Sequence, residues 1–304
     1  MIICGDAVQE LKKLPEKSTH CCVTSPPYYG LRDYGQERQI GFEQTPDEYV
    51  AKLVDVFRCV RRVLRDDGTV WLNLGDSYCN PSQPGGGDPT IGKRNIGKSK
   101  YRSNMPPGLK PKYLIGIPWR VAFALQADGW YLRQDIIWHK PNPMPESVKD
   151  RCTKAHEYIF LLSKSQKYFY DAEAVKEPAK WERWGNQTEK KKHPGTGKFL
   201  GGKMLDELPI KTTKNKRSVW TIPTKPCKEA HFAVFPPNLI QPCILAGCPE
   251  NGTVLDPFFG AGTTGIVAQQ HNRKYIGIDI SAEYCEIAKI RIAAAELEVQ
   301  EDNK

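Results

Sequence analysis

A glycine-rich segment near the end of the chain most constrains the fold. Residues Gly260 to Gly265, which read GAGTTG, follow an apolar segment from Thr253 to Leu255. A second apolar segment, Tyr275 to Ile278, ends at Asp279. Glycines between a strand and a helix let a ligand approach the backbone, and the start of the helix offers amide donors to an anionic group. An acid at the end of the next strand accepts hydrogen bonds from ribose hydroxyls. The unit therefore predicts a nucleotide-like ligand.

The rest of the chain repeats the alternation of strand and helix. Met1 to Cys4, Val8 to Leu14 and Cys21 to Val23 form a strand, a helix and a strand. Apolar residues then recur every three or four positions from Pro46 to Leu64, ahead of an apolar strand at Thr69 to Leu74. Further elements are expected as helices at Ile117 to Gly129 and Ala282 to Glu296. This alternation predicts an α/β fold with a doubly wound sheet covered by helices on both faces.

A proline-rich element follows the strand at Cys21 to Val23. It reads Thr24-Ser25-Pro26-Pro27-Tyr28 and supplies a side-chain oxygen, a carbonyl, a rigid bend and an aromatic face. Two acceptors that draw on the hydrogens of an exocyclic base amine make its nitrogen more nucleophilic, and Tyr28 can stack on an extruded base. Alone, the element is also typical of a strand terminator or a proline-rich ligand. Because this element and the glycine-rich segment both follow strands of one α/β sheet, we expect them to line a shared crevice.

The glycine unit alone fits either NAD or S-adenosylmethionine, since both carry an adenosine. A dinucleotide domain usually opens its chain and continues with further strands after the acid, whereas only one helix and a tail follow Asp279. Asp256-Pro257-Phe258 also differs from the apolar strand end of a dehydrogenase. The context favours S-adenosylmethionine.

At these residues the chain resembles the amino-methylating DNA methyltransferases of the beta arrangement, in which the catalytic motif precedes a target-recognition region and the cofactor motif comes last. The likeness extends to four other segments: Gly5-Asp6, Trp138 to Asn142, Trp220 to Thr224 and His231 to Pro236. It implies a mixed seven-stranded sheet of the Rossmann-like methyltransferase type, with inserted DNA-recognition segments. Its terminal antiparallel hairpin would comprise Tyr131 to Trp138 and Glu157 to Leu162.

The resemblance also implies site residues and partners. The catalytic residues would be Ser25, Pro26, Pro27 and Tyr28. The S-adenosylmethionine contacts would come from eight residues: Asp6, Phe235, Asp256, Phe258, Gly260, Gly262, Thr263 and Asp279. Within that set Asp279 would hold the ribose, Asp6 would lie near the adenine and Phe235 would close over the cofactor. The substrate would be double-stranded DNA, and a cognate restriction endonuclease is a possible partner.

Three basic residues are expected to contact DNA. Arg32 lies in the loop after the catalytic element, and His139 and Lys140 lie at a strand end near the same rim. Each also has a structural interpretation, such as an Arg32 and Asp33 pair that orders the loop.

Ser25 bears on which base is modified. It stands where other family members carry Asp or Asn, and it resembles the version associated with the cytosine N4 amine. Serine can accept a hydrogen bond from either amine, so adenine N6 stays the alternative. Cytosine C5 methylation needs a cysteine nucleophile after a proline. Pro226-Cys227 is such a dipeptide, but it lies far from the catalytic element.

Two polar segments divide the chain. We expect the catalytic half of the methyltransferase domain at 1–79, a flexible polar loop at 80–107, the continued sheet at 108–175, a target-recognition region at 176–218 and the cofactor-binding half at 219–304. The lysine-rich clusters of the fourth segment suit phosphate contacts, although a solvated insertion would look alike in isolation.

Composition bears on the partner, the metal content and the cellular location of the protein. The 44 basic and 35 acidic residues give a net charge of +9, which suits an anionic partner but also an ordinary basic enzyme. Cys227, Cys243 and Cys248 lack metal-binding spacing, so no metal is predicted. No leader or apolar run of membrane-spanning length is present, so a cytoplasmic protein of a bacterium, an archaeon or a phage is expected, with no membrane partner and its oligomeric state left open.

Two other classes compete with a DNA methyltransferase. A protein-glutamine or RNA amine methyltransferase would use a similar Pro-Pro-Tyr geometry, but those enzymes resemble an arrangement with the cofactor motif first. A catalytically silent DNA-binding module would not need both Ser25 to Tyr28 and Gly260 to Gly265 intact.

Overall fold

The computed structural model describes residues 1–31, 38–79, 108–179, 199–200, 203–204, 212–224 and 235–302. The chain forms two compact units. The larger unit joins Met1–Asp171 to Ser218–Lys304, and the smaller unit spans Ala172–Arg217. Within the smaller unit two short strand pairs are described: β6 (Glu177–Pro178) with β9 (Thr213–Lys214), and β7 (Phe199–Leu200) with β8 (Lys203–Met204). Its target-recognition role stays a prediction.

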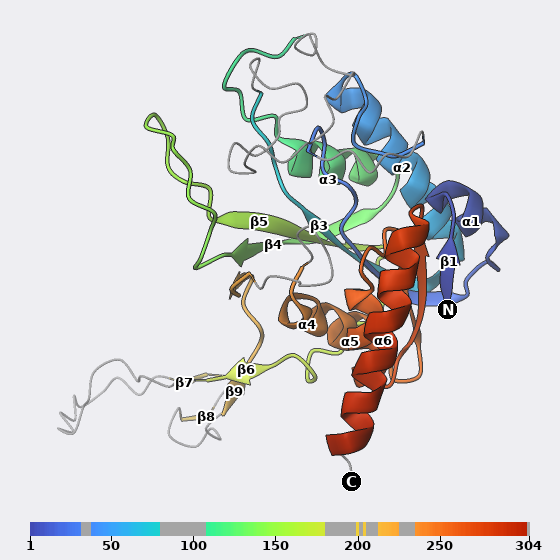
Figure 1. The fold of residues 1–304 in the computed structure, drawn as a ribbon. Coiled ribbons are helices and arrows are strands. Elements are labelled where there is room, and N and C mark those ends of the chain that lie inside the picture. Colours follow the sequence, from blue (N-terminus) through green and yellow to red (C-terminus); the bar gives the residue numbers. More distant parts are fainter. Residues whose placement is uncertain are drawn as a thin grey trace, which may run out of the picture. The chain divides into compact units, whose positions relative to one another are not determined.

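An eight-stranded sheet forms the centre of the larger unit (Figure 1). Its strand order is β1-β12-β11-β2-β3-β5-β4-β10. Neighbouring strands are parallel except at β5, which runs antiparallel to both β3 and β4. The strands are β1 (Ile2–Cys4), β2 (Thr19–Thr24), β3 (Leu64–Leu74), β4 (Tyr131–His139), β5 (His156–Ser163), β10 (Val219–Thr221), β11 (Thr253–Asp256) and β12 (Lys274–Asp279).

The mixed α/β sheet and its antiparallel hairpin are confirmed, but the hairpin is not terminal, because β10 lies beyond β4. β4 and β5 pair from Tyr131 opposite Ser163 to His139 opposite His156. The predicted number of seven strands is one too few, because β10 adds a parallel edge strand with Trp220 opposite Trp138. A three-residue strand is too short to show an alternating pattern in the sequence, and its place depends on contacts with β4.

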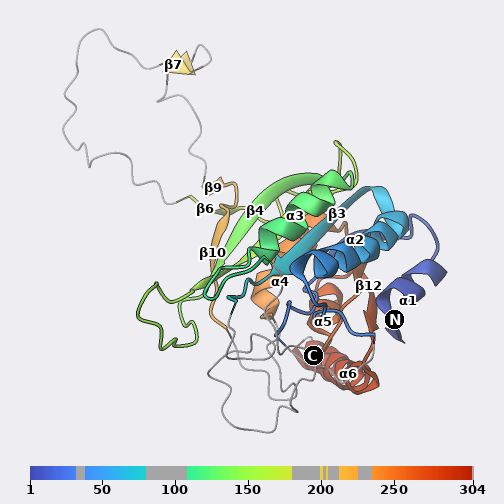
Figure 2. The same cartoon turned by 90° about the horizontal axis from the view of Figure 1, so that it is seen from above.

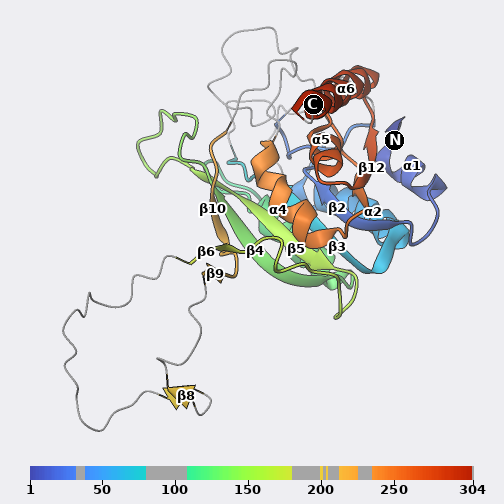
Figure 3. The ribbon, with the colours of Figure 1, turned by 90° about the horizontal axis from the view of Figure 1, so that it is seen from below.

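Three helices cover each face of the sheet. α1 (Ala7–Lys13), α2 (Pro46–Val63) and α3 (Ile117–Ala127) lie on one face, as Figure 2 shows. α4 (Pro237–Gly247), α5 (Thr263–Gln270) and α6 (Ala282–Asp302) lie on the other, toward the viewer in Figure 3. α2 starts with a capping box, in which Thr45 and Glu48 each accept a hydrogen bond from the backbone amide of the other. None of the described helices is long and apolar enough to cross a membrane.

The core lies on both faces of the central strands. Leu53, Phe57 and Val60 of α2 are fully buried, as are Leu72 of β3 and Phe160 of β5. The three α2 residues are spaced three or four positions apart, which is the pattern that predicted this helix. Because the middle of the sheet is covered on both sides, ligands reach it only at the strand ends.

Candidate active site

The two motifs follow neighbouring strands. β2 and β11 are parallel, with Cys21 opposite Val254 and Cys22 opposite Leu255. The segment Ser25 to Tyr28 directly follows β2, and the segment Pro257 to Gly262 directly follows β11. The carboxyl ends of parallel neighbours meet at one edge of a sheet, so both segments face the same crevice.

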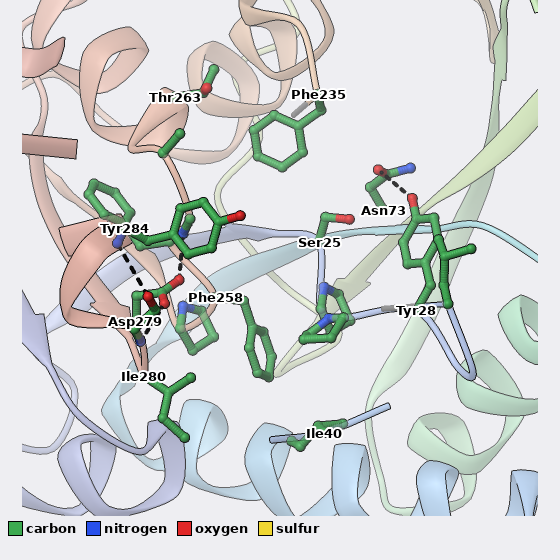
Figure 4. A pocket seen from close by; sticks show the side chains of 18 of the residues that line it. Ser25, Tyr28, Ile40, Asn73, Phe235, Phe258, Thr263, Asp279, Ile280 and Tyr284 are labelled. Atoms are coloured by element: carbon green, nitrogen blue, oxygen red, sulfur yellow. Dashed lines mark hydrogen bonds between the residues drawn. The ribbon is translucent and has the colours of Figure 1, made fainter. Parts of the chain in front are cut away.

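A cavity of about 390 Å³ occupies this crevice. Its lining includes ten of the predicted catalytic and cofactor-binding residues: Asp6, Ser25, Pro26, Pro27, Tyr28, Phe235, Phe258, Gly260, Thr263 and Asp279. Figure 4 shows Asp279 and Tyr284 toward one end, Tyr28 and Asn73 toward the other, and Ser25 and Phe258 between them. The cavity therefore has an acidic end beside the glycine turn and an aromatic end beside the proline element.

Asp279 connects the glycine turn to β12. Its Oδ2 accepts a 2.7 Å hydrogen bond from the amide of Gly260, and its Oδ1 accepts a 2.9 Å bond from the amide of Ser281. Burial raises the pKa of the Asp279 carboxyl, and the two amide donors oppose that rise. Gly262 has φ of +80°, and a Cβ there would lie 2.8 Å from the Cβ of Ala288, so the turn requires glycine at this position.

Asp256 lies beneath the glycine turn and is only 1% exposed. Its Oδ1 accepts hydrogen bonds from the Thr24 hydroxyl at 2.6 Å and the Phe258 amide at 3.1 Å, and its Oδ2 accepts one from the Thr264 hydroxyl at 2.6 Å. Burial raises the pKa of the Asp256 carboxyl to about 6, against the effect of these donors. We assign Asp256 to holding the turn in place, because its carboxylate oxygens are engaged by protein donors and, unlike Asp279, it is not among the residues that line the cavity.

Asp6 is positioned next to Asp279 by strand pairing. β1 pairs with β12 so that Cys4 lies opposite Asp279, and the amide of Gly5 donates to the Asp279 carbonyl at 2.9 Å. Asp6 lines the cavity and caps α1, where its Oδ1 accepts a 3.0 Å hydrogen bond from the amide of Gln9. One carboxylate oxygen thus has a structural partner, and the side chain stays at the acidic end of the cavity.

Tyr28 has a carboxylate partner that the sequence analysis did not predict. The Tyr28 hydroxyl donates to Oε2 of Glu157 at 2.6 Å, and its oxygen lies 3.3 Å from Oδ1 of Asn73. The pKa of Tyr28 is raised well above its ordinary value, first by burial and then by the charge of Glu157. The phenol therefore stays protonated. Gly75 lies against the ring, since a Cβ there would be 2.4 Å from Cε2 of Tyr28.

Glu157, at the start of β5, contacts both Tyr28 at the aromatic end of the cavity and the ammonium group of Lys140. Its Oε1 forms an ion pair with Nζ of Lys140, and its Oε2 also accepts a 3.3 Å hydrogen bond from Nδ2 of Asn73. Burial would raise the pKa of Glu157, but the charge of Lys140 and the hydrogen bonds from Lys140, Tyr28 and Asn73 outweigh it, so the pKa is lowered. Glu157 stays ionised at neutral pH. In the sequence, the available signal for Glu157 was a single carboxylate at the start of an apolar strand.

The carbonyls of the two prolines differ in their partners. The Tyr49 hydroxyl donates a 2.9 Å hydrogen bond to the carbonyl of Pro27. Among the residues that the structure describes, no donor is bonded to the carbonyl of Pro26. Pro26 also lines the cavity together with Ser25. The side chain of Ser25 and the carbonyl of Pro26 are therefore the acceptors that the proline element can offer to a ligand.

The predicted DNA-binding residues have different surroundings. Lys140 points into the site: its side chain is 19% exposed, its Nζ lies 4.2 Å from the centroid of the Trp138 ring, and it lines the cavity. His139 is at the rim, where its Nδ1 lies 3.1 Å from Oγ1 of Thr221 on β10. Arg32 and the loop at 80–107 lie outside the described residues, as do Cys227 and the lysines at 190–192. Cys243 and Cys248 are buried.

The cavity fits S-adenosylmethionine. Asp279 offers carboxylate oxygens beside a left-handed glycine turn and the start of α5, which suits a ribose next to a close backbone approach. Phe258, Ile280 and Tyr284 add apolar surface around that end. Among the described residues, no cluster of three or more His, Cys, Asp or Glu side chains is arranged to hold a metal ion. When bound, the cofactor supplies an electrophilic methyl group.

Comparisons with known proteins agree with this geometry. Residues 19–290 match a family described as DNA methylase, of the N6 and N4 methyltransferase type. The chain is 50% identical over 294 residues to Type II methyltransferase M.SmaI of Serratia marcescens, covering 96% of this chain and 90% of that protein. It is 48% identical over 296 residues to Type II methyltransferase M.Cfr9I of Citrobacter freundii, covering 97% and 88% of the two chains.

Two solved structures share the fold. PvuII DNA methyltransferase (cytosine-N4-specific) superposes with a TM-score of 0.64 at 20% identity, over 96% of this chain and 85% of that one. TTHA0409, a putative DNA modification methylase of Thermus thermophilus solved in complex with S-adenosyl-L-methionine, superposes with a TM-score of 0.60 at 22% identity, over 97% and 93%.

Proposed function

Because this chain belongs to the N6 and N4 DNA methylase family, we propose that it transfers the methyl group of S-adenosylmethionine to the N4 amine of a cytosine flipped out of double-stranded DNA. The observation that carries the proposal is the shared cavity. Asp279 and the glycine turn line one end of it, Tyr28 lines the other, and Ser25 lies between them (Figure 4). A methyl donor and an extruded base can therefore meet within one enclosed site.

Ser25 and Pro26 would prepare the amine. The exocyclic nitrogen starts with its lone pair delocalised into the base ring, and hydrogen bonds to Ser25 Oγ and the Pro26 carbonyl favour a more pyramidal nitrogen. S-adenosylmethionine, held by Asp279 and the glycine turn, would supply the methyl group that this nitrogen takes up. The product nitrogen is cationic and acidic, so its proton leaves without a strong base. Positioning and electrostatics supply most of the rate enhancement.

We assign the remaining residues by their place around the cavity. Tyr28 stacks on the extruded base, and Pro27 fixes the bend while its carbonyl is bonded to Tyr49. Asp279 holds the ribose and Asp6 faces the adenine of the cofactor. The other cofactor contacts come from the turn and the opposite wall: Phe235, Phe258, Gly260, Gly262 and Thr263.

Lys140 supports cytosine over adenine. Its ammonium carries three donors and no acceptor, and it faces the cavity with Glu157 as counter-ion. Beside the exocyclic amine, cytosine presents the acceptors N3 and O2, whereas adenine presents the acceptor N1 and an apolar C2–H. A cationic donor at this wall can bond to both acceptors of cytosine but to only one of adenine. Serine at position 25 supports the same choice.

The protein would recognise a short DNA sequence through its basic segments. Arg32, His139 and the segments at 80–107 and 176–218 would contact the duplex, with phosphate contacts setting its register. The names of the relatives, which are Type II methyltransferases, support a restriction endonuclease of the same sequence specificity as partner.

Product analysis tests the proposal. The protein is incubated with duplex DNA and isotope-labelled S-adenosylmethionine, the DNA is digested to nucleosides, and the products are identified by mass spectrometry. We expect labelled N4-methylcytosine. N6-methyladenine would contradict the choice of base, and the absence of label in any DNA would overturn the function. Ser25→Ala is the matched control, because it should lose transfer while still binding the cofactor in calorimetry.

A further inference from the structure

We propose that Met144 is a wedge that enters the base stack and keeps the target base outside the duplex. This inference rests on the proposed function, because a gap in the stack exists only if a base is flipped. Met144 lies in the loop between β4 and β5, six residues after Trp138, whose ring also lines the cavity.

The exposure of Met144 is the first observation. Its side chain is 59% exposed although it is large and apolar. Among the exposed large apolar side chains of the described residues, Met144 is the one that lines the cavity. An exposed apolar side chain that also lines the cavity is available to a partner that covers it, and covering it is favourable.

The support of Met144 is the second observation. Two residues before it, Asn142 is bonded to the backbone of Thr224: its Oδ1 accepts from the amide at 3.0 Å and its Nδ2 donates to the carbonyl at 3.2 Å. Two residues after it, Glu146 accepts hydrogen bonds from Arg151 at 2.7 Å and from the amide of Lys154 at 3.0 Å. The tip between these anchors is therefore held at both ends.

The sequence of the tip limits its motion further. Pro143 and Pro145 flank Met144, and each proline ring fixes one backbone dihedral. Arg151, which donates to Glu146, is itself held by Tyr78: its Cζ lies 3.9 Å from the centroid of the Tyr78 ring. Because the loop is already ordered, its backbone loses little conformational entropy when the side chain of Met144 inserts, which favours a wedge at this position.

The chemistry of methionine suits the gap. Extruding a base sacrifices its stacking and pairing, which is unfavourable. An apolar side chain between the remaining bases recovers part of that contact, as apolar wedges do in proteins that unstack DNA. Methionine is unbranched and polarisable, so it fills an irregular space and packs well against aromatic faces.

The test compares two duplexes that contain the sequence methylated by the wild-type protein. In one the target base is normally paired, and in the other it lies opposite an abasic site, which lowers the cost of flipping. Single-turnover methyl transfer is measured for the wild type, Met144→Ala and Met144→Leu. We expect Met144→Ala to slow transfer about tenfold on the paired duplex and less than twofold on the abasic one. Met144→Leu, which keeps the apolar bulk, should stay within about threefold of the wild type on both.

The outcomes distinguish a failure of the wedge proposal from a failure of the proposed function. Equal slowing of Met144→Ala on both duplexes would assign Met144 to DNA binding and overturn the wedge, as would an unchanged rate on the paired duplex. A wild type that methylates neither duplex would overturn the proposed function and the wedge with it. A fluorescent cytosine analogue at the target position gives an independent readout, since Met144→Ala should lower the flipped fraction at saturating protein.

Discussion

The hydroxyl of Thr24, the last residue of β2, donates a 2.6 Å hydrogen bond to the carboxylate of Asp256, the last residue of β11. This bond links the strand that leads to the proline element with the strand that leads to the glycine turn. Thr264 of α5 holds the other oxygen of the same carboxylate at 2.6 Å. Both sides of the cavity therefore depend on one buried carboxylate.

Asp256→Asn should change how stability depends on pH. Burial raises the pKa of Asp256 from 3.8 to about 6, so the folded protein binds more protons than the unfolded chain between those values. The contribution of Asp256 to the free energy of unfolding is then largest below pH 3.8 and is lost as the pH rises through about 6. The loss amounts to roughly 3 kcal/mol. Urea denaturation from about pH 4 to 7 should show the wild type losing this amount relative to the variant. A constant difference would contradict the assignment.

Tyr28 should act mainly through its ring. Tyr28→Phe removes the donor to Glu157 but keeps the stacking face, so we expect less than about tenfold loss of kcat/KM for DNA methylation. Tyr28→Ala removes the ring and should lose about ten- to a hundredfold, which corresponds to the value of one base-aromatic stack. The contrast is measured by initial rates on one duplex. Equal losses in both variants would assign the effect to the hydroxyl instead.

Gly75→Ala should act through Tyr28. The added methyl would lie 2.4 Å from Cε2 of Tyr28, so the ring has to shift within the cavity. We expect an activity loss of about tenfold or more with cofactor affinity unchanged, because the cofactor end of the cavity is remote from this contact. The control is the same substitution in a Tyr28→Ala background, where it should cost little. Additive losses in this double-mutant cycle would mean that Gly75 acts on something other than the ring.

Asp279→Asn should weaken cofactor binding. The amide loses the charge and sets an NH2 donor against the amide of Gly260 or Ser281, both of which donate to the native carboxylate. A charged hydrogen bond to a ribose hydroxyl is worth about ten- to a hundredfold in affinity. Burial raises the pKa of Asp279, so lowering the pH should protonate it and weaken cofactor binding to the wild type, while the variant lacks this titration. Calorimetry with S-adenosylmethionine across pH measures both effects, and Ser25→Ala serves as a reference with intact binding. Unchanged affinity in Asp279→Asn would remove Asp279 from the cofactor site.

Local patterns predicted most of the fold. The apolar spacing along Pro46 to Leu64 predicted α2. The apolar segments at Tyr131 to Trp138 and Glu157 to Leu162 predicted the hairpin of β4 and β5. β10 and α4 were not predicted. β10 has three residues, and α4 contains Pro242 within the helix, so neither has the pattern that ordinarily marks its type.

The sequence by itself predicted most of the chemical groups that line the cavity. Ser25 to Tyr28, the glycine turn and Asp279 each stand at the end of an apolar strand, and that local signal was sufficient to find them. Only the tertiary structure decided their partners. Glu157 lies 129 residues from Tyr28 along the chain, and Asp256 lies 232 residues from Thr24. Strand order brings these pairs together, because the sheet sets β11 beside β2 and packs β5 against β3. Hydrogen bonds over such separations depend on that order, which no local pattern of residues encodes.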